Sequence, residues 1–139
     1  MSKGNAVFVE ESDVETQVFD WGRLRWLSEP RVTAAERFSA GVVYLEPGKG
    51  HERHNHPGVE EILYVLSGTG EQTVDIAGRS LRREVSPGVL IHIPPGIYHS
   101  TVNTGREPMR LLAIYAPPGP EAELRAMDGV RVEPPQRNS

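Results

Sequence analysis

Glycine and proline divide this chain into short apolar segments, and this pattern limits the possible folds more than any other feature of the sequence. The 139 residues include 14 glycines and 12 prolines, which separate runs rich in Val, Ile, Leu and Tyr. Short β-prone runs bounded by turn-forming residues predict strands. Their regular spacing is typical of an all-β sandwich or barrel. We expect strands at 37–45, 61–66, 71–76, 80–85, 89–93, 100–102 and 110–116.

Two tight turns predict antiparallel pairing between neighbouring strands. Ser67-Gly68-Thr69-Gly70 and Ala77-Gly78 each join two of the expected strands, and glycine supplies the positive φ that such turns need. Helix is expected only at 120–127, which has proline at its start, acidic residues in its first turn and glycine just past its end. The remaining segments are interpreted from composition alone: 6–9 and 15–21 as edge strands, and 133–139 as a frayed tail.

The length of the chain favours one domain with one hydrophobic core. A chain of 139 residues lies within the usual size of a single domain. No internal repeat or linker divides it. We therefore expect a single domain over 1–139, with a core at about 37–116, extension strands within 1–36 and a C-terminal extension or tail over 117–139.

Composition excludes several classes of function. No apolar run approaches the roughly 20 residues that span a bilayer, and the first ten residues lack the pattern of a secretory signal, so we expect a cytoplasmic protein with no membrane role. The net charge is −4 and the basic residues are scattered, which argues against nucleic acid as a partner. Because the chain has no cysteine, any metal must be held by His, Asp or Glu.

The histidines cluster in a way that predicts a site. Side chains alternate along a strand, so His54 and His56 are expected to share one face, whereas His51 has the opposite parity and is expected to point away. Pro57-Gly58 then breaks the strand and resets this parity, which allows Glu61 to face the same interior. Its neighbour Glu60 is expected to face solvent.

A further histidine enters from a distant part of the chain. His99 follows the rigid turn Pro94-Pro95-Gly96, where proline fixes φ and holds the imidazole at low entropic cost. His92 lies on an expected strand and is interpreted as a structural or exposed residue. The sequence therefore brings together three imidazoles and one carboxylate as a hypothetical metal site.

These residues resemble the two sequence motifs of the cupin superfamily. The resemblance implies an antiparallel jelly-roll β-barrel that binds one metal ion through His54, His56, Glu61 and His99. One position departs from the motif, since Val89 follows the glycine where many cupins have Asp, and no ligand is lost by this change. The first motif is met by Gly48, His54, His56, Glu61 and Gly68, and the second by Gly88, Pro94, Gly96, His99 and Asn103.

Three imidazoles and one carboxylate suit a divalent Mn, Fe, Co, Ni, Cu or Zn ion. In six-coordinate geometry this set leaves two positions open for a substrate with oxygen donors, which favours a small-molecule metalloenzyme, either dioxygenase-like or an isomerase or lyase. Two alternatives stay open: a cupin that binds or senses a small, sugar-like ligand without catalysis, and a structural barrel with a vestigial ion.

Two more residues are candidates for contact with the substrate. Tyr44 precedes the first motif and is expected to reach the interior of the barrel, where its hydroxyl group would serve as an acid or a hydrogen-bond donor. Arg53, beside His54, would meet an anionic group at the rim. The segment 61–66 is apolar on both faces after Glu61, so we expect a second sheet or a second subunit to cover it. We predict a homodimer that forms through the N-terminal segments 6–9 and 15–21.

Overall fold

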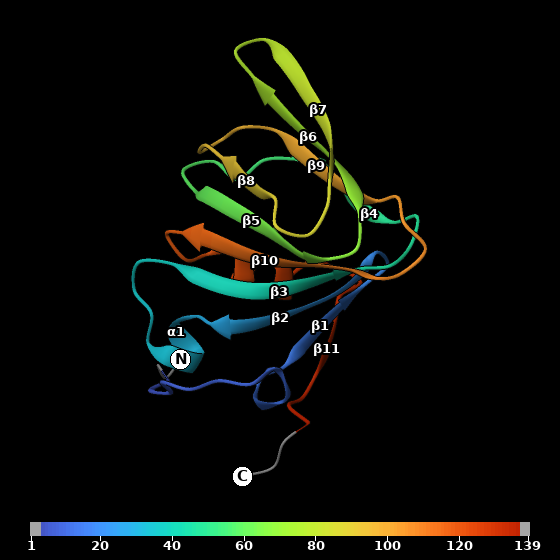
Figure 1. Ribbon diagram of the computed structural model, residues 1–139. Helices are drawn as coiled ribbons and strands as arrows, with labels where there is room; N and C mark the ends of the chain where they lie inside the picture. The colour runs from blue at the N-terminus through green and yellow to red at the C-terminus, as the bar shows by residue number, and fades with distance from the viewer. Residues whose placement is uncertain (1–3, 137–139) are drawn as a thin grey trace.

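The structure is a computed structural model that describes residues 4–136, and it consists mainly of antiparallel strands in two sheets (Figure 1). The large sheet has seven strands in the order β11-β1-β2-β3-β10-β5-β8, and the small sheet has four in the order β4-β9-β6-β7. The large sheet contains β1 (Thr16–Phe19), β2 (Gly22–Ser28), β3 (Ser39–Leu45), β5 (Glu60–Ser67), β8 (Leu90–Ile93), β10 (Met109–Ala116) and β11 (Arg131–Glu133). The small sheet contains β4 (Gly50–His54), β6 (Gly70–Ile76), β7 (Arg79–Val85) and β9 (His99–Asn103).

The chain passes repeatedly between the two sheets, which is the connectivity of a jelly roll. It leaves the large sheet after β3 to form β4, returns for β5, and crosses again for β6. The expected all-β jelly-roll class is therefore confirmed. The hairpin of β6 and β7 extends beyond the barrel at the top of Figure 1, and six of the seven β7 residues are exposed.

The hydrophobic core lies between the two sheets and follows the alternation of the strands. On β10, Leu111, Ala113 and Tyr115 are buried, while the residues between them are only partly covered. On β5, Leu63 and Val65 face the same interior. Burial of one face of each strand fixes the register, because a slip by one residue would expose the apolar set.

Short helical segments flank the barrel. They are the 3₁₀ turn Glu11–Asp13, α1 (Pro30–Thr33) and α2 (Pro120–Arg125). The α2 helix lies in the expected region and is fastened to β1, because Gln17 Nε2 donates a hydrogen bond to the Glu121 carbonyl oxygen at 3.1 Å. No helix within residues 4–136 is long and apolar enough to cross a membrane.

The ends of the chain contribute more to the sheet than composition indicates. β2 lies between β1 and β3 and supplies the buried Leu24 and Trp26. The expected strand at 6–9 does not form, and the strand expected at 15–21 is shortened to β1. Glu133 was expected to begin a frayed tail, but it pairs with Thr16 as part of β11, and the last expected tail residues, 137–139, lie outside the described residues.

Candidate metal centre

A cavity of about 730 Å³ opens between the small sheet and the C-terminal segment. Strand β4 supplies His51 and His54 to its wall, and His56 follows directly after that strand. Tyr115 comes from β10. Other parts of its wall are apolar and come from Trp21, between β1 and β2, and from Leu124 and Met127 in and just after α2.

Three histidines expected from the sequence come together beside this cavity, and two of them, His54 and His56, line it. One ring nitrogen each of His54, His56 and His99 lies within 4.8 Å of the other two. His54 and His99 are register partners on β4 and β9, and their ring centroids are 4.3 Å apart. The pairing of two strands that are distant in sequence therefore builds most of the cluster.

Glu61 joins this cluster from the large sheet. Its side chain is 3% exposed, and its Oε1 atom lies 3.1 Å from His99 Nε2 and 3.8 Å from His56 Nε2. Glu60 faces the other way, as expected, and its carboxylate contacts His92 Nε2 at 2.5 Å on the surface. The turn at Pro57-Gly58 thus places one of two adjacent carboxylates inside the barrel.

Buried polar atoms at the cluster have no partner within the described part of the chain. His56 Nε2, Glu61 Oε1 and His99 Nε2 are all inaccessible to solvent, and none has a hydrogen bond of good geometry. An unsatisfied buried polar group costs about 1–3 kcal/mol, so three such atoms converging on one point indicate a missing common partner. A metal ion would satisfy all of them, and the donor set fits one.

Backbone carbonyl groups set the tautomers of two of the histidines. His99 Nδ1 lies 2.9 Å from the Ile97 carbonyl oxygen, and His54 Nδ1 lies 2.6 Å from that of Glu52. A carbonyl oxygen can only accept, so each Nδ1 carries a proton, and in the neutral imidazole Nε2 is the atom with a lone pair for a metal. This arrangement is common for histidines that bind metals.

The surroundings lower the pKa of two histidines of the cluster and raise the pKa of the third. Burial lowers the pKa of His56 to about 4, and burial also lowers the pKa of His54. Burial opposes the charge of His99 as well, but the neighbouring Glu61 carboxylate outweighs it and raises the pKa of His99. Two of the three imidazoles are therefore neutral at pH 7, the state in which a histidine can bind a metal.

Tyr115 is a site residue that no pattern in the sequence indicates. It is the register partner of Glu61, and its hydroxyl group hydrogen-bonds to that carboxylate. Its ring meets His56 edge-on, with centroids 5.4 Å apart. Burial first, and then the Glu61 charge, raise the pKa of Tyr115 well above its ordinary value, so the hydroxyl keeps its proton.

The expectation that His51 points away from the other histidines is wrong. His51 lines the same cavity as His54, and the two ring centroids are 5.5 Å apart. The cause is a register shift in β4: His51 pairs with Thr101 and His54 pairs with His99. Glu52 and Arg53 are thus matched with the single residue Ser100 of β9, and this bulge reverses the parity that simple alternation predicts.

The other two candidates lie outside the cavity. Tyr44 was expected to reach the interior, but it lies on the outer face of β3, where its hydroxyl group donates to Glu11 Oε1 at 2.5 Å and its ring packs under Arg23. Arg53 is exposed, donates from Nε to Asp75 Oδ2 at 2.8 Å, and covers the ring of Tyr98. The structure therefore does not bring Tyr44 or Arg53 to the histidine cluster.

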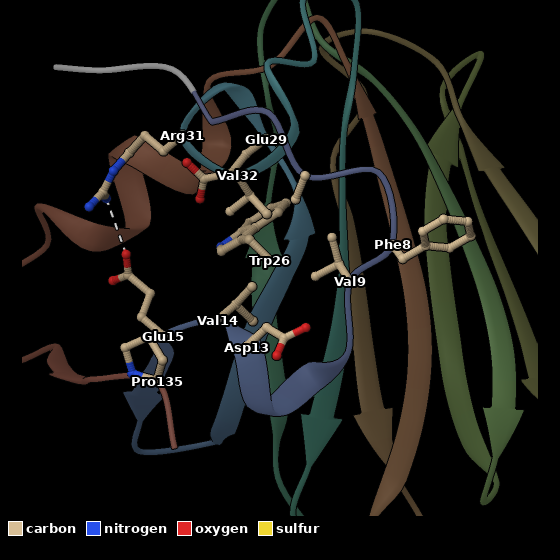
Figure 2. A pocket seen from close by; sticks show the side chains of 11 residues that line it. Phe8, Val9, Asp13, Val14, Glu15, Trp26, Glu29, Arg31, Val32 and Pro135 are labelled. Atoms are coloured by element: carbon tan, nitrogen blue, oxygen red, sulfur yellow. Dashed lines mark hydrogen bonds and ion pairs between the residues drawn. The ribbon is translucent and has the colours of Figure 1, made fainter. Parts of the chain in front are cut away.

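A second cavity, of about 500 Å³, lies near the N-terminal segment and lacks unpaired ligand groups of this kind (Figure 2). Among its charged residues, Glu15 binds Arg31 at 3.1 Å and Arg125 at 3.3 Å, and Glu29 binds Arg125 at 2.8 Å. Burial raises the pKa of Glu29. These ion pairs tie α2 to the barrel, and they are interpreted as structural.

A family model described as the cupin domain matches residues 41–115. Protein SchB of Streptomyces halstedii is 31% identical over 128 residues, which are 92% of this chain and 90% of that protein. Polyketide synthase CurC of Streptomyces cyaneus is 29% identical over 92% of this chain and 80% of its own length. The polyketide cyclase RemF of Streptomyces resistomycificus superposes with a TM-score of 0.66 and 27% identity, over 81% of this chain and 82% of that one.

Proposed function

This chain belongs to the cupin domain family, and on that premise we propose that it is a metal-dependent enzyme that acts on a small molecule through neighbouring oxygen atoms. The proposed ligands of the ion are His54, His56, Glu61 and His99. The observation that carries the proposal is the convergence of buried, unpartnered nitrogen and oxygen atoms from three of these residues. All four ligands are nitrogen or oxygen donors, a set that suits Mn, Fe, Co, Ni, Cu or Zn.

A bound divalent ion would supply Lewis acidity, which polarises a carbonyl or enol oxygen and stabilises negative charge that develops on it. The residues of the chain provide the rest of the arrangement. Tyr115 keeps its proton and orients the Glu61 carboxylate through a hydrogen bond. Trp21, Leu124 and Met127 form an apolar wall beside the reacting groups, which would favour an apolar part of the substrate over water.

Similarity to a polyketide synthase component and a polyketide cyclase supports a more specific substrate class. We propose a polyketide-derived aromatic molecule, whose adjacent keto and phenol oxygens would occupy the open positions beside the histidines. A cavity of about 730 Å³ lies in the usual range for small-molecule sites, roughly 300–1,000 Å³. This substrate favours isomerase- or lyase-type chemistry, such as ring closure, over dioxygenase-like chemistry.

Metal analysis tests the proposal most directly. Protein prepared without a polyhistidine tag is expected to hold about one transition-metal ion per chain, and His54→Ala to lose it, because one of the few ligands is removed. His92→Ala is the matched control, since His92 lies on the outside of the barrel, where its Nε2 atom contacts the Glu60 carboxylate. Wild-type protein that retains no metal after loading would refute the proposed function.

Activity separates catalysis from ligand binding. Metal-loaded wild-type protein would be incubated with aromatic polyketide precursors, with oxygen uptake measured in parallel. Ring closure without oxygen uptake supports the proposed chemistry, whereas oxygen uptake with product formation supports the dioxygenase-like alternative. Tight binding of such molecules without turnover, in both assays, would identify a non-catalytic binding cupin.

The outer face of the large sheet supports a second proposal, that two copies of this chain associate. Leu112, Tyr64 and Leu90 are register partners on β10, β5 and β8, and form an apolar row across three strands. Tyr64 is 38% exposed and Leu90 is 55% exposed. Sedimentation at micromolar concentration is expected to give a dimer, and Tyr64→Lys together with Leu90→Lys to give a monomer.

A further inference from the structure

His51 lines the cavity beside His54 and His56 but is not one of the proposed metal ligands, and its position follows from the bulge in β4. Thr101 and His99 are two residues apart on β9 and share a face, and they pair with His51 and His54 respectively. His51 therefore lies on the same side of the small sheet as His54, because their partners on β9 share that face. Its imidazole lines the cavity beside the proposed metal ligands.

Aromatic packing holds this imidazole in place. The ring of Trp21 meets His51 edge-on, with centroids 4.2 Å apart and planes at 81°. Trp21 is itself stacked on Phe19 at 4.5 Å, with the two planes 9° apart. Because its neighbours fix the ring, His51 can present a nitrogen to a ligand with little loss of side-chain entropy.

The ring nitrogens of His51 have no polar partner within the described chain. Among residues 4–136, no hydrogen bond or ion pair involves its ring nitrogens, in contrast to His54, His92 and His99. His51 is also absent from the group of ring nitrogens that lie within 4.8 Å of one another. Its nitrogens are thus free for a molecule in the cavity, and they stand apart from the metal cluster.

We propose that His51 is a substrate-binding residue, which hydrogen-bonds to an oxygen atom of the molecule held at the metal and does not itself bind the metal. The inference rests on the proposed function, because it requires an ion at the neighbouring histidines. If His51 binds in this way, the substrate has a third oxygen beside the two that reach the metal. A fused aromatic ring system with phenol and keto groups in a row has this arrangement.

The test uses Co²⁺-loaded protein and two probes. Azide is a small ligand that binds the metal alone. 1,8-Dihydroxyanthraquinone is planar and carries three oxygens in a row, so two can reach the metal and the third can reach His51. The visible spectrum of Co²⁺ reports the coordination of the ion, and titration gives the Kd of each probe. His51→Phe keeps a ring against Trp21, and His51→Gln keeps a hydrogen-bonding group.

In His51→Phe we expect the Co²⁺ content, the Co²⁺ spectrum and the azide Kd of the wild-type protein, with the Kd of 1,8-dihydroxyanthraquinone raised about tenfold, the effect of one hydrogen bond. His51→Gln should recover part of this affinity. His92→Phe is the control and should bind both probes as the wild-type protein does, because His92 faces away from the cavity.

Two results would overturn the inference while leaving the proposed function intact. One is an unchanged Kd for 1,8-dihydroxyanthraquinone in His51→Phe, which would mean that His51 only packs against Trp21. The other is loss of Co²⁺ or a changed Co²⁺ spectrum in a folded His51 variant, which would make His51 a metal ligand. A wild-type protein that holds no Co²⁺ would instead refute the proposed function, and this inference with it.

Discussion

Tyr115 of β10 lies directly opposite Glu61 of β5, and its hydroxyl group donates a hydrogen bond to that carboxylate. The pair joins the core to the histidine cluster, because Glu61 Oε1 is also 3.1 Å from His99 Nε2. A carboxylate oriented in this way loses less freedom when it binds an ion. Partners of this kind usually change metal affinity about 10–100-fold when they are removed.

Tyr115→Phe is therefore expected to weaken metal binding by about 10–100-fold while the protein stays folded. Competition with a chromophoric chelator at pH 7 measures the change. Tyr98→Phe is the control, since Tyr98 is 41% exposed and lies under Arg53 on the outside of the barrel. Equal affinities in the two variants would show that the hydroxyl of Tyr115 does not orient Glu61.

The metal-free protein is expected to lose stability as the pH falls below about 6.5. Burial lowers the pKa of His51 to about 3 and that of His56 to about 4, from an ordinary value of 6.5. The unfolded chain therefore binds more protons than the folded chain between pH 6.5 and about 4, which destabilises the fold there. Urea denaturation at pH 7 and at pH 4.5 measures this difference.

His51→Phe removes one of these groups, so the variant should lose less stability than the wild-type protein between the same two pH values. The raised pKa of His99 acts in the opposite direction in both proteins and cancels in the comparison. An identical loss in both proteins would contradict the assignment of His51 as a neutral, buried imidazole.

Arg125→Ala is expected to destabilise the protein by about 2 kcal/mol, because it leaves the Glu29 carboxylate, 3% exposed, without its partner at 2.8 Å. Urea denaturation measures the free energy of unfolding. Arg131→Ala is the control, because the pair of Arg131 with Glu133 is exposed and such pairs contribute little. Arg125→Ala removes the ion pairs of α2 but not its hydrogen bond from Gln17, and cleavage by a glutamate-specific protease at Glu121 or Glu123 is expected to become faster.

Gly68→Ala is expected to be more destabilising than Gly48→Ala, although both glycines have positive φ, 82° and 78°. A Cβ atom at Gly68 would lie 2.9 Å from Met109 Cα, whereas one at Gly48 would meet nothing within 4 Å. The strain of positive φ, about 1 kcal/mol, is common to both variants. Thermal unfolding of the two proteins isolates the contribution of the close contact, and equal midpoints would contradict it.

Most of the barrel could be predicted because its strands alternate and end at glycine or proline. β10 illustrates this, since every second residue from Met109 to Tyr115 is buried. β2 does alternate, since Arg23 and Arg25 lie between buried apolar residues, but the N-terminal part of the chain was interpreted from composition alone and its pairing with β3 has no local signal.

The site could be predicted only as far as its residues follow a local rule. His54, His56, Glu61 and His99 were found through strand parity, a turn and a resemblance between motifs, and the structure brings them close together. Tyr115 could not be found, because its partner is opposite it on another strand. His51 was misplaced, because a bulge depends on the match between two strands and leaves no mark in one of them.

The bulge between His51 and His54 offsets the odd spacing of these two histidines in the sequence. Glu52 and Arg53 are both exposed, so substitutions there should leave the geometry of the cavity unchanged. Deleting either residue would remove the bulge and leave the two histidines two residues apart, so simple alternation would keep both on the cavity side with the same partners on β9. The extra residue of the bulge thus makes an odd spacing of histidines equivalent to an even one, and this gives the cavity a histidine besides the proposed metal ligands.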